Sequence, residues 1–303
     1  MNTGYLNPLY TKSFSDYGSP LYLEKCGGWV LKRNIPGFSY NDAMWTYPIF
    51  TCLNWGKLPE DMNQLADTLV SISAVTDPFG NYSYEDLQEA FPDVCYPFKD
   101  HFIVDLGRSP ESFVNPHHRR NVNHAVRNVK VLISEDPSEW LDEWDSLYNL
   151  LVIRHKIKGI TRFSKKIFET QLSVPGIIAF KAFFDRECVG MLLWYTQNSI
   201  AYYHLGAYTD LGYKQKASFA LFWNAIEYFA DHSLKWMSLG AGAGLQRNNN
   251  DGLTRFKSGW ATGVRTAYFC GRIFDHGKYS EISSSKNNAA VDFFPAYRFG
   301  EFF

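Results

Sequence analysis

Three strand-like runs followed by an apolar helical pattern constrain the fold of this chain more than any other feature. The runs are rich in aliphatic and aromatic residues and are separated by short polar turns: they span residues 177–184, 188–195 and 200–206. Turns of this length join antiparallel neighbours, so the runs predict a β-meander. Apolar residues then recur at helical spacing from Phe219 to Phe229, which predicts a helix. A meander followed by a helix is typical of an α+β fold.

The remaining patterns divide the chain into two mixed blocks. Its 303 residues exceed the usual size of one domain, and we expect a boundary near Ser109-Pro110, giving domains 1–110 and 111–303. The first block is predicted to hold a hairpin at 21–33, a helix from 59 whose spacing reaches 72, a strand at 73–77, a helix at 84–90 and a strand pair at 95 and 101–106. The second adds helices at 115–128, at 136–155 and from 164, a strand at 235–239, a helix at 251–257 and a strand pair at 264–274. The aromatic tail 293–303 is expected to pack on its own domain or on a partner, and both alternatives stay open.

Charge and cysteine content restrict the class of function. With 30 basic and 31 acidic residues the net charge is −1, which argues against a protein-wide electrostatic grip on nucleic acid. The five cysteines are scattered and form no paired motif, so we expect reduced thiols. No signal-peptide pattern or membrane-length apolar run occurs, and a cytoplasmic location is expected. The oligomeric state is left open.

A basic segment at residues 117–130 is the first candidate binding site. Arg119, Arg120 and Arg127 lie in a stretch without any acidic residue between Glu111 and Glu135. Guanidinium groups bind phosphate oxygens in pairs, so the helix suits a phosphate-bearing substrate. A merely solvated basic face is an equal alternative. The nearby histidines match no metal template, and no metal is expected.

Three segments of the second block resemble the GNAT acyltransferase fold, in the branch with two GNAT-like domains that includes the FemAB aminoacyl transferases. They are the basic helix at 115–127, the run at 203–210 before the central helix, and the run at 252–260, which is similar to the family's Gly-Leu-x-x-Phe-Lys-x-x-Phe segment with Trp260 in the last place. The resemblance covers about half of the chain. It implies two GNAT-like domains with mixed, mostly antiparallel sheets flanked by helices.

The resemblance also implies where the donor binds. In the GNAT fold the turn into the central helix presents backbone N–H groups to a pyrophosphate; here Lys214, Lys216 and Ser218 stand in that turn, which lacks the family's internal glycines. The glycine-rich run 240–244 has no dinucleotide-binding spacing and is expected to form a tight or flexible turn beside the cleft.

The reacting groups are expected on two segments. Tyr203, His204 and Asp210 cluster at the end of the third strand, and His204 has the reference pKa closest to neutrality, although a structural histidine is an alternative. The family resemblance implies that Phe256 and Lys257 lie beside the donor channel, with the lysine meeting negative charge near the reacting ester. Arg255, next to them, is expected to help to bind the substrate or donor. In the alternative, Phe256 is a core anchor and Lys257 its exposed neighbour.

These observations lead to an acyltransferase that forms an amide bond between an activated donor, aminoacyl-tRNA or acyl-CoA, and an amino group of a small molecule or peptide. The donor would be a co-substrate, so no permanently bound cofactor is expected, and tRNA is a possible partner. A catalytically silent GNAT-like binding module is the main alternative. A nucleic-acid-binding protein is the third, weakened by the near-zero net charge.

Overall fold

The computed structural model describes residues 2–242, 251–288 and 290–301 and divides the chain into two compact units. Unit 1 comprises residues 1–4, 99–157 and 163–265, and unit 2 comprises residues 5–98, 158–162 and 266–303. This division differs from the expected boundary near residue 110, because residues 266–303 group with the first hundred residues. The physical reason is strand pairing: Phe269–Ile273 lie antiparallel to Ser71–Val75.

The sheet of unit 1 contains the predicted meander. Its strands follow the order β5-β10-β9-β8-β7-β6. Their bounds are Val94–Asp105 for β5, of which residues 99–105 belong to this unit, Lys130–Ser134 for β6, Ile177–Phe184 for β7, Glu187–Gln197 for β8, Ile200–Tyr208 for β9 and Trp236–Gly240 for β10. Every pair is antiparallel except β9 with β10. The meander and the strand that follows the central helix are thus confirmed, whereas β6 had no sequence prediction.

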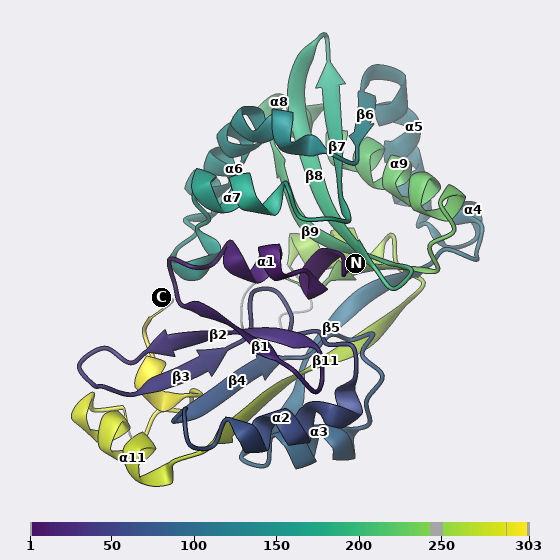
Figure 1. Ribbon diagram of the computed structural model, residues 1–303. Coiled ribbons are helices and arrows are strands. Elements are labelled where there is room, and N and C mark those ends of the chain that lie inside the picture. The colour runs from purple at the N-terminus through teal and green to yellow at the C-terminus, as the bar shows by residue number, and fades with distance from the viewer. Residues whose placement is uncertain (1, 243–250, 289, 302–303) are drawn as a thin grey trace. The chain divides into compact units, whose positions relative to one another are not determined.

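Helices cover both faces of this sheet (Figure 1). They are α4 (Pro110–Phe113), α5 (Pro116–Asn128), α6 (Leu141–His155), α7 (Lys165–Gln171), α8 (Asp210–Lys214), α9 (Ala217–Asp231) and α10 (Gly252–Ser258). Successive side chains of a strand point to opposite faces. Trp194 on β8 accordingly packs on Phe222 and Phe229 of α9, while Tyr195 donates its hydroxyl to the carbonyl of Gln171 in α7. The central helix therefore lies on one face and α6 and α7 on the other.

Unit 2 is a second mixed sheet with the strand order β1-β2-β3-β4-β11. The strands are β1 (Ser19–Leu23), β2 (Gly28–Asn34), β3 (Asn41–Met44), β4 (Ser71–Val75) and β11 (Gly263–Ile273), and the helices are α1 (Pro8–Lys12), α2 (Leu58–Gln64), α3 (Tyr84–Ala90) and α11 (His276–Ser285). Only β3 and β4 run parallel among these neighbours. The predicted hairpin and the helix at 84–90 are confirmed. The helix from residue 59 is shorter than its apolar spacing indicated: α2 ends at Gln64, and Ile72 belongs to β4 instead.

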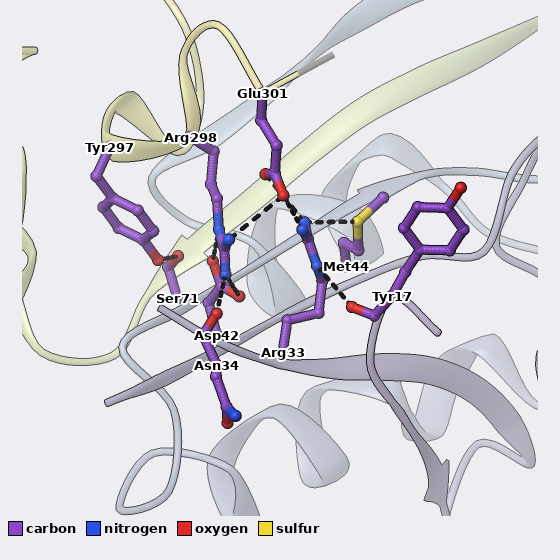
Figure 2. A network of polar contacts seen from close by, with 9 residues as sticks. All are labelled: Tyr17, Arg33, Asn34, Asp42, Met44, Ser71, Tyr297, Arg298 and Glu301. Atoms are coloured by element: carbon purple, nitrogen blue, oxygen red, sulfur yellow. Dashed lines mark hydrogen bonds and ion pairs between the residues drawn. The ribbon is translucent and has the colours of Figure 1, made fainter. Parts of the chain in front are cut away.

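A buried polar network holds the C-terminal segment against β2, β3 and β4, and we call it the C-terminal clasp (Figure 2). Arg298 donates from Nε and Nη2 to the two carboxylate oxygens of Asp42, at 2.9 and 2.8 Å, and both side chains are at most 6% exposed. Nη2 also donates to the carbonyl of Asn34 at 2.8 Å. Arg33 pairs with Glu301 beside them. The described part of the aromatic tail therefore packs within its own unit, and residues 302–303 lie outside the described residues.

Candidate active site

The two parallel neighbours of unit 1, β9 and β10, diverge at their C-terminal ends. Residues 200–202 of β9 pair with residues 236–238 of β10, and no pairing between the two strands continues beyond Tyr202. From there β9 runs on beside β8, whereas the end of β10 pairs with Phe102 of β5 after an irregularity between Ser238 and Gly240. Ligands commonly bind outside the carboxyl ends of parallel strands, where neighbouring strands diverge.

Lys257 lies where these strands diverge. Its Nζ donates to the carbonyl of Ala241, just after β10, at 2.7 Å, and lies 5.2 Å from the ring centre of Tyr203, the first residue of β9 beyond the pairing. The helix α10 fixes this position, because Asp251 caps it by accepting from the amides of Leu253 and Thr254. The side chain predicted from the family motif is therefore at an unpaired strand junction.

Lys257 is buried, with only 4% of its surface exposed. Burial, and next the positive charge of Lys99, lower its pKa to about 7, against the attraction of Asp251. The alternative in which it is an exposed neighbour of Phe256 does not fit this burial. A lysine with this pKa is present both as ammonium and as neutral amine near neutral pH. This suits a group that stabilises charge or transfers a proton.

Two basic side chains of β5 also approach this point, and the sequence analysis missed both. Lys99 donates to the carbonyl of Gly242 at 3.4 Å, and burial lowers its pKa. His101 is 8% exposed, and burial, followed by the charges of Lys257 and Lys99, lowers its pKa to about 3. Their spacing of two residues within a strand was the available signal, since it places both side chains on one face.

The structure does not bring His204 together with Lys257. In the register between β8 and β9, Leu193 pairs with Leu205 and Trp194 pairs with Tyr203. His204 therefore has no partner residue in β8 and lies at a bulge in β9. Tyr203 packs on Trp194 and on Phe222 of α9. His204 is 4% exposed and lies on the opposite face, with Nε2 3.2 Å from Oε1 of Gln171.

The surroundings of His204 favour a structural role. Its ring stacks on Phe163 at 6.2 Å, and burial lowers its pKa to about 3. Asp210 is also away from the strand junction: it begins α8, is exposed, and pairs with Arg154. Of the four expected reacting residues, the structure brings together Tyr203 and Lys257.

A substitution tests the structural role of His204. We expect His204→Gln to retain the catalytic activity of the protein and to lower its free energy of unfolding by about 1–3 kcal/mol, because the buried contact with Gln171 is disturbed. Urea unfolding and NMR titration would measure this, and no His204 resonance should titrate between pH 5 and 8. A loss of turnover in a variant of unchanged stability would instead give His204 a role in catalysis.

Two of the expected donor-binding residues, Lys216 and Phe256, lie at the start of α9. Lys216 adopts a left-handed backbone conformation immediately before this helix, and its Nζ donates to Asn121 of α5 at 2.6 Å. His118 of α5 contacts the carbonyl of Phe256 through Nε2 at 2.8 Å. These contacts tie α5, α9 and α10 together. Phe256 packs on Phe219 and Phe222, so it is a core anchor of α10.

The basic residues of this region face outward to different degrees. Arg120, Arg127, Lys214 and Arg255 are exposed, while Arg119, Lys216 and Ser218 are half-buried. Arg119 and Arg120 line a hollow with Pro116 and Asn123.

Among the described residues no group of three His, Cys, Asp or Glu side chains could hold a metal ion. Within the same ranges no helix is long and apolar enough to cross a membrane. Residues 243–250, which contain the end of the glycine-rich run, lie outside the described residues.

Solved structures of other proteins share this architecture, although sequence comparisons find no match. No protein-family model matches the sequence, and no curated protein matches it significantly. Among solved structures, FemX superposes with a TM-score of 0.68 at 14% identity over 93% of this chain and 95% of FemX. The C-terminal domain of a putative lysylphosphatidylglycerol synthetase from Agrobacterium fabrum gives 0.64 at 12% identity, over 89% and 92%. L-PGS from Bacillus licheniformis gives 0.55 at 14% identity, over 89% and 93%.

These similarities extend over nearly the whole chain, although the resemblance noted in the sequence covered only half of it. At such low identity they establish the fold alone. The chain has the fold of FemX, with mixed, mostly antiparallel sheets flanked by helices, and its predicted resemblance to the FemAB-related branch with two GNAT-like domains is confirmed at that level.

Proposed function

We propose that this protein is an N-acyltransferase or aminoacyltransferase that forms an amide bond between an activated acyl donor and an amino group. The observation that carries the proposal is Lys257, a buried ammonium held at the point where β9 and β10 diverge. FemX and a putative lysylphosphatidylglycerol synthetase share the fold, and the second name denotes the joining of a lysyl group to a lipid. The structural likeness supports transfer of an acyl or aminoacyl group here, and the choice of an amino group as the acceptor rests on the FemAB-like motif around Lys257.

The chemistry needs a cation where charge develops. The amine nitrogen attacks the carbonyl carbon of the ester or thioester, and the carbonyl oxygen gains negative charge before the bond to the leaving group breaks. The amine loses a proton, and the leaving oxygen or sulfur gains one. A buried ammonium stabilises such an oxyanion more than an exposed one, because water does not screen it. Tyr203 covers Lys257 on one side and so helps to exclude water.

The arginines of α5, of which Arg120 and Arg127 are exposed, are proposed to bind the phosphate groups of the donor. We expect the triple variant Arg119→Ala, Arg120→Ala and Arg127→Ala to bind donor more weakly, since each lost charge-assisted phosphate bond costs about 1.5–3 kcal/mol. Stability should hardly change, because Arg120 and Arg127 are exposed. Titration of donor over a salt series measures this. If affinity and its salt dependence stay the same, α5 is only a solvated face.

The donor is proposed to be aminoacyl-tRNA or acyl-CoA, used as a co-substrate, and the acceptor a small-molecule or peptide amine. Lys214, Lys216 and Ser218 at the start of α9 would contribute to donor binding. The purified protein is to be incubated with charged tRNA pools or acyl-CoA mixtures together with cell-extract amines, and new amides detected by mass spectrometry. We expect one donor class to give a product.

The same experiment addresses the alternative of a silent binding module. That alternative is favoured by the missing glycines of the donor turn. Native mass spectrometry detects which donor the protein retains. Retention of a donor without any amide product, for both donor classes, would make this chain a binding module and overturn the proposed reaction.

A further inference from the structure

Three basic side chains converge on one short backbone segment in unit 1. Lys257 donates to the carbonyl of Ala241 at 2.7 Å, and Lys99 approaches the next carbonyl, that of Gly242, at 3.4 Å. His101 lies next to this segment on β5, because the following residue, Phe102, pairs with Gly240, immediately before Ala241. The charges of both lysines contribute to lowering its pKa. The two lysines come from different elements, α10 and β5, so no single-helix or single-strand pattern explains the convergence.

Little negative charge balances Lys257. Within the described ranges it has no carboxylate at ion-pair distance, and the carboxylate that attracts it, Asp251, already accepts from two amides and from the hydroxyl of Thr254. The sequence itself contains no acidic residue between Asp231 and Asp251. Burying positive charge without a partner is costly, and such sites are typical of places where a ligand supplies the opposite charge.

His101 gives a second, independent indication of a ligand. The residue is 8% exposed, and its Nδ1 has no hydrogen-bond partner among the described residues. Buried polar atoms are nearly always satisfied by protein, water or ligand. Since its pKa is about 3, the ring is neutral at physiological pH and can offer one N–H group, with the proton on Nδ1, to an anion without adding charge.

We propose that Lys99, His101 and Lys257 form an anion site that binds a phosphate group of the donor. The inference rests on the proposed function and deepens it, because it assigns the two β5 residues to the same site. Two ammonium groups and one N–H donor from separate directions match the several oxygens of a phosphate better than the two of a carboxylate. Both donor classes carry phosphates, at different distances from the reacting carbonyl. In aminoacyl-tRNA the terminal ribose bears both a phosphate and the ester, so Lys257 could meet the phosphate and the oxyanion together. In acyl-CoA the pantetheine arm separates the pyrophosphate from the thioester, so with that donor a phosphate site at Lys257 would replace its role at the oxyanion.

Binding at this site should take up a proton. Lys257 is faced by Lys99 and His101 from β5, by Tyr203 from β9 and by Asp251 from the start of α10. With a pKa of about 7 it is mostly neutral at pH 8. A bound phosphate favours the ammonium form and raises that pKa, so the protein binds a proton together with the anion.

The test is calorimetric titration of the full chain at pH 8 with three probes: inorganic pyrophosphate, adenosine 5′-monophosphate and coenzyme A. Two buffers of different ionisation enthalpy give the number of protons taken up. We expect Lys99→Met and Lys257→Met each to weaken binding about tenfold or more, the effect of losing one charge-assisted bond, and Lys257→Met to abolish proton uptake. Lys235→Met is the matched control, because Lys235 is an exposed lysine just before β10. It should bind like the parent protein.

The outcomes separate this inference from the proposed reaction. Unchanged affinity in both Lys99→Met and Lys257→Met, in variants that circular dichroism shows to be folded, would place the anion elsewhere and overturn the site, as would no binding of any probe. No acceptor is present, so a failure of amide formation leaves this result intact. Preference for adenosine 5′-monophosphate over coenzyme A would indicate a nucleotide phosphate as the source, and the reverse order would indicate the coenzyme.

Discussion

Replacing Lys257 by methionine is expected to lower turnover by about 10²–10³, the usual cost of removing one group that stabilises a developing oxyanion. Methionine keeps much of the aliphatic stem but removes the charge, so the contacts with Tyr203 and the fold of α10 should persist. Single-turnover rates with saturating donor and acceptor measure the effect on chemistry apart from binding. Lys235→Met serves as control for the general loss of one lysine. Unchanged turnover would make Lys257 a structural residue.

The same variant should be more stable than the parent protein. Because the pKa of Lys257 is about 7 in the folded state, against 10.5 for a free lysine side chain, the unfolded chain binds the extra proton between these values. The free energy of unfolding of the parent therefore rises with pH across this window, and the burial cost is fully present below about pH 7. Lys257→Met should thus gain about 1–4 kcal/mol at pH 6, and the gain should shrink towards pH 10. Urea unfolding at both pH values measures it.

Breaking the C-terminal clasp is expected to cost the most stability. Arg298→Met leaves the carboxylate of Asp42 buried without its cation, and loss of one partner of a buried pair costs about 3–5 kcal/mol. Asp42→Asn should have a similar effect. The double variant should lose less than the sum, because no uncompensated charge remains.

An exposed ion pair provides the control for the clasp. Lys57 and Glu60 are about half exposed, so Lys57→Met should change stability by about 1 kcal/mol or less. Tryptophan fluorescence during urea unfolding gives the midpoint for each variant. Equal midpoints for Arg298→Met and Lys57→Met would contradict the importance of the clasp.

Elements whose stability depends on local pattern could be predicted from the sequence. The meander is bounded by short polar turns, and observed strands β7, β8 and β9 lie close to the predicted runs. The helix α9 follows from apolar residues that recur at helical spacing and are buried in the structure. For the same reason α5, whose first residue is Pro116 behind the capping Asn115, begins and ends near the predicted limits.

Features that depend on distant pairing could not be read from local pattern. β5 and β11 are each one continuous strand, although the sequence predicted a pair of strands in both places. Residues 266–303 group with unit 2 and not with the second expected domain, because β11 pairs with β4 and Arg298 pairs with Asp42 across 256 residues. Nothing near either residue marks the pair.

The candidate site shows the same division. Lys257 was found because a short family motif surrounds it, and Tyr203 because it lies in a predictable strand. Tyr203 and His204 contact opposite faces of the sheet, as alternation along a strand predicts for neighbouring residues. Lys99 and His101 carry no motif, and their relevance depends on where β5 lies beside β10.

The discontinuity of unit 2 has a consequence for how the chain is made. Residues 5–98 leave the ribosome before most of unit 1, yet β4 lacks its neighbour β11, and Asp42 lacks Arg298, until some two hundred further residues have been translated. Unit 1, whose main segments lie between, is synthesised in the meantime. Domains generally fold as units during synthesis. Residues 5–98 therefore keep an open sheet edge at β4 while the residues of unit 1 are synthesised and fold. A ribosome stalled before residue 269 would hold a translated meander and a unit 2 that still lacks β11, a state in which the edge of β4 is available to chaperones or to other chains.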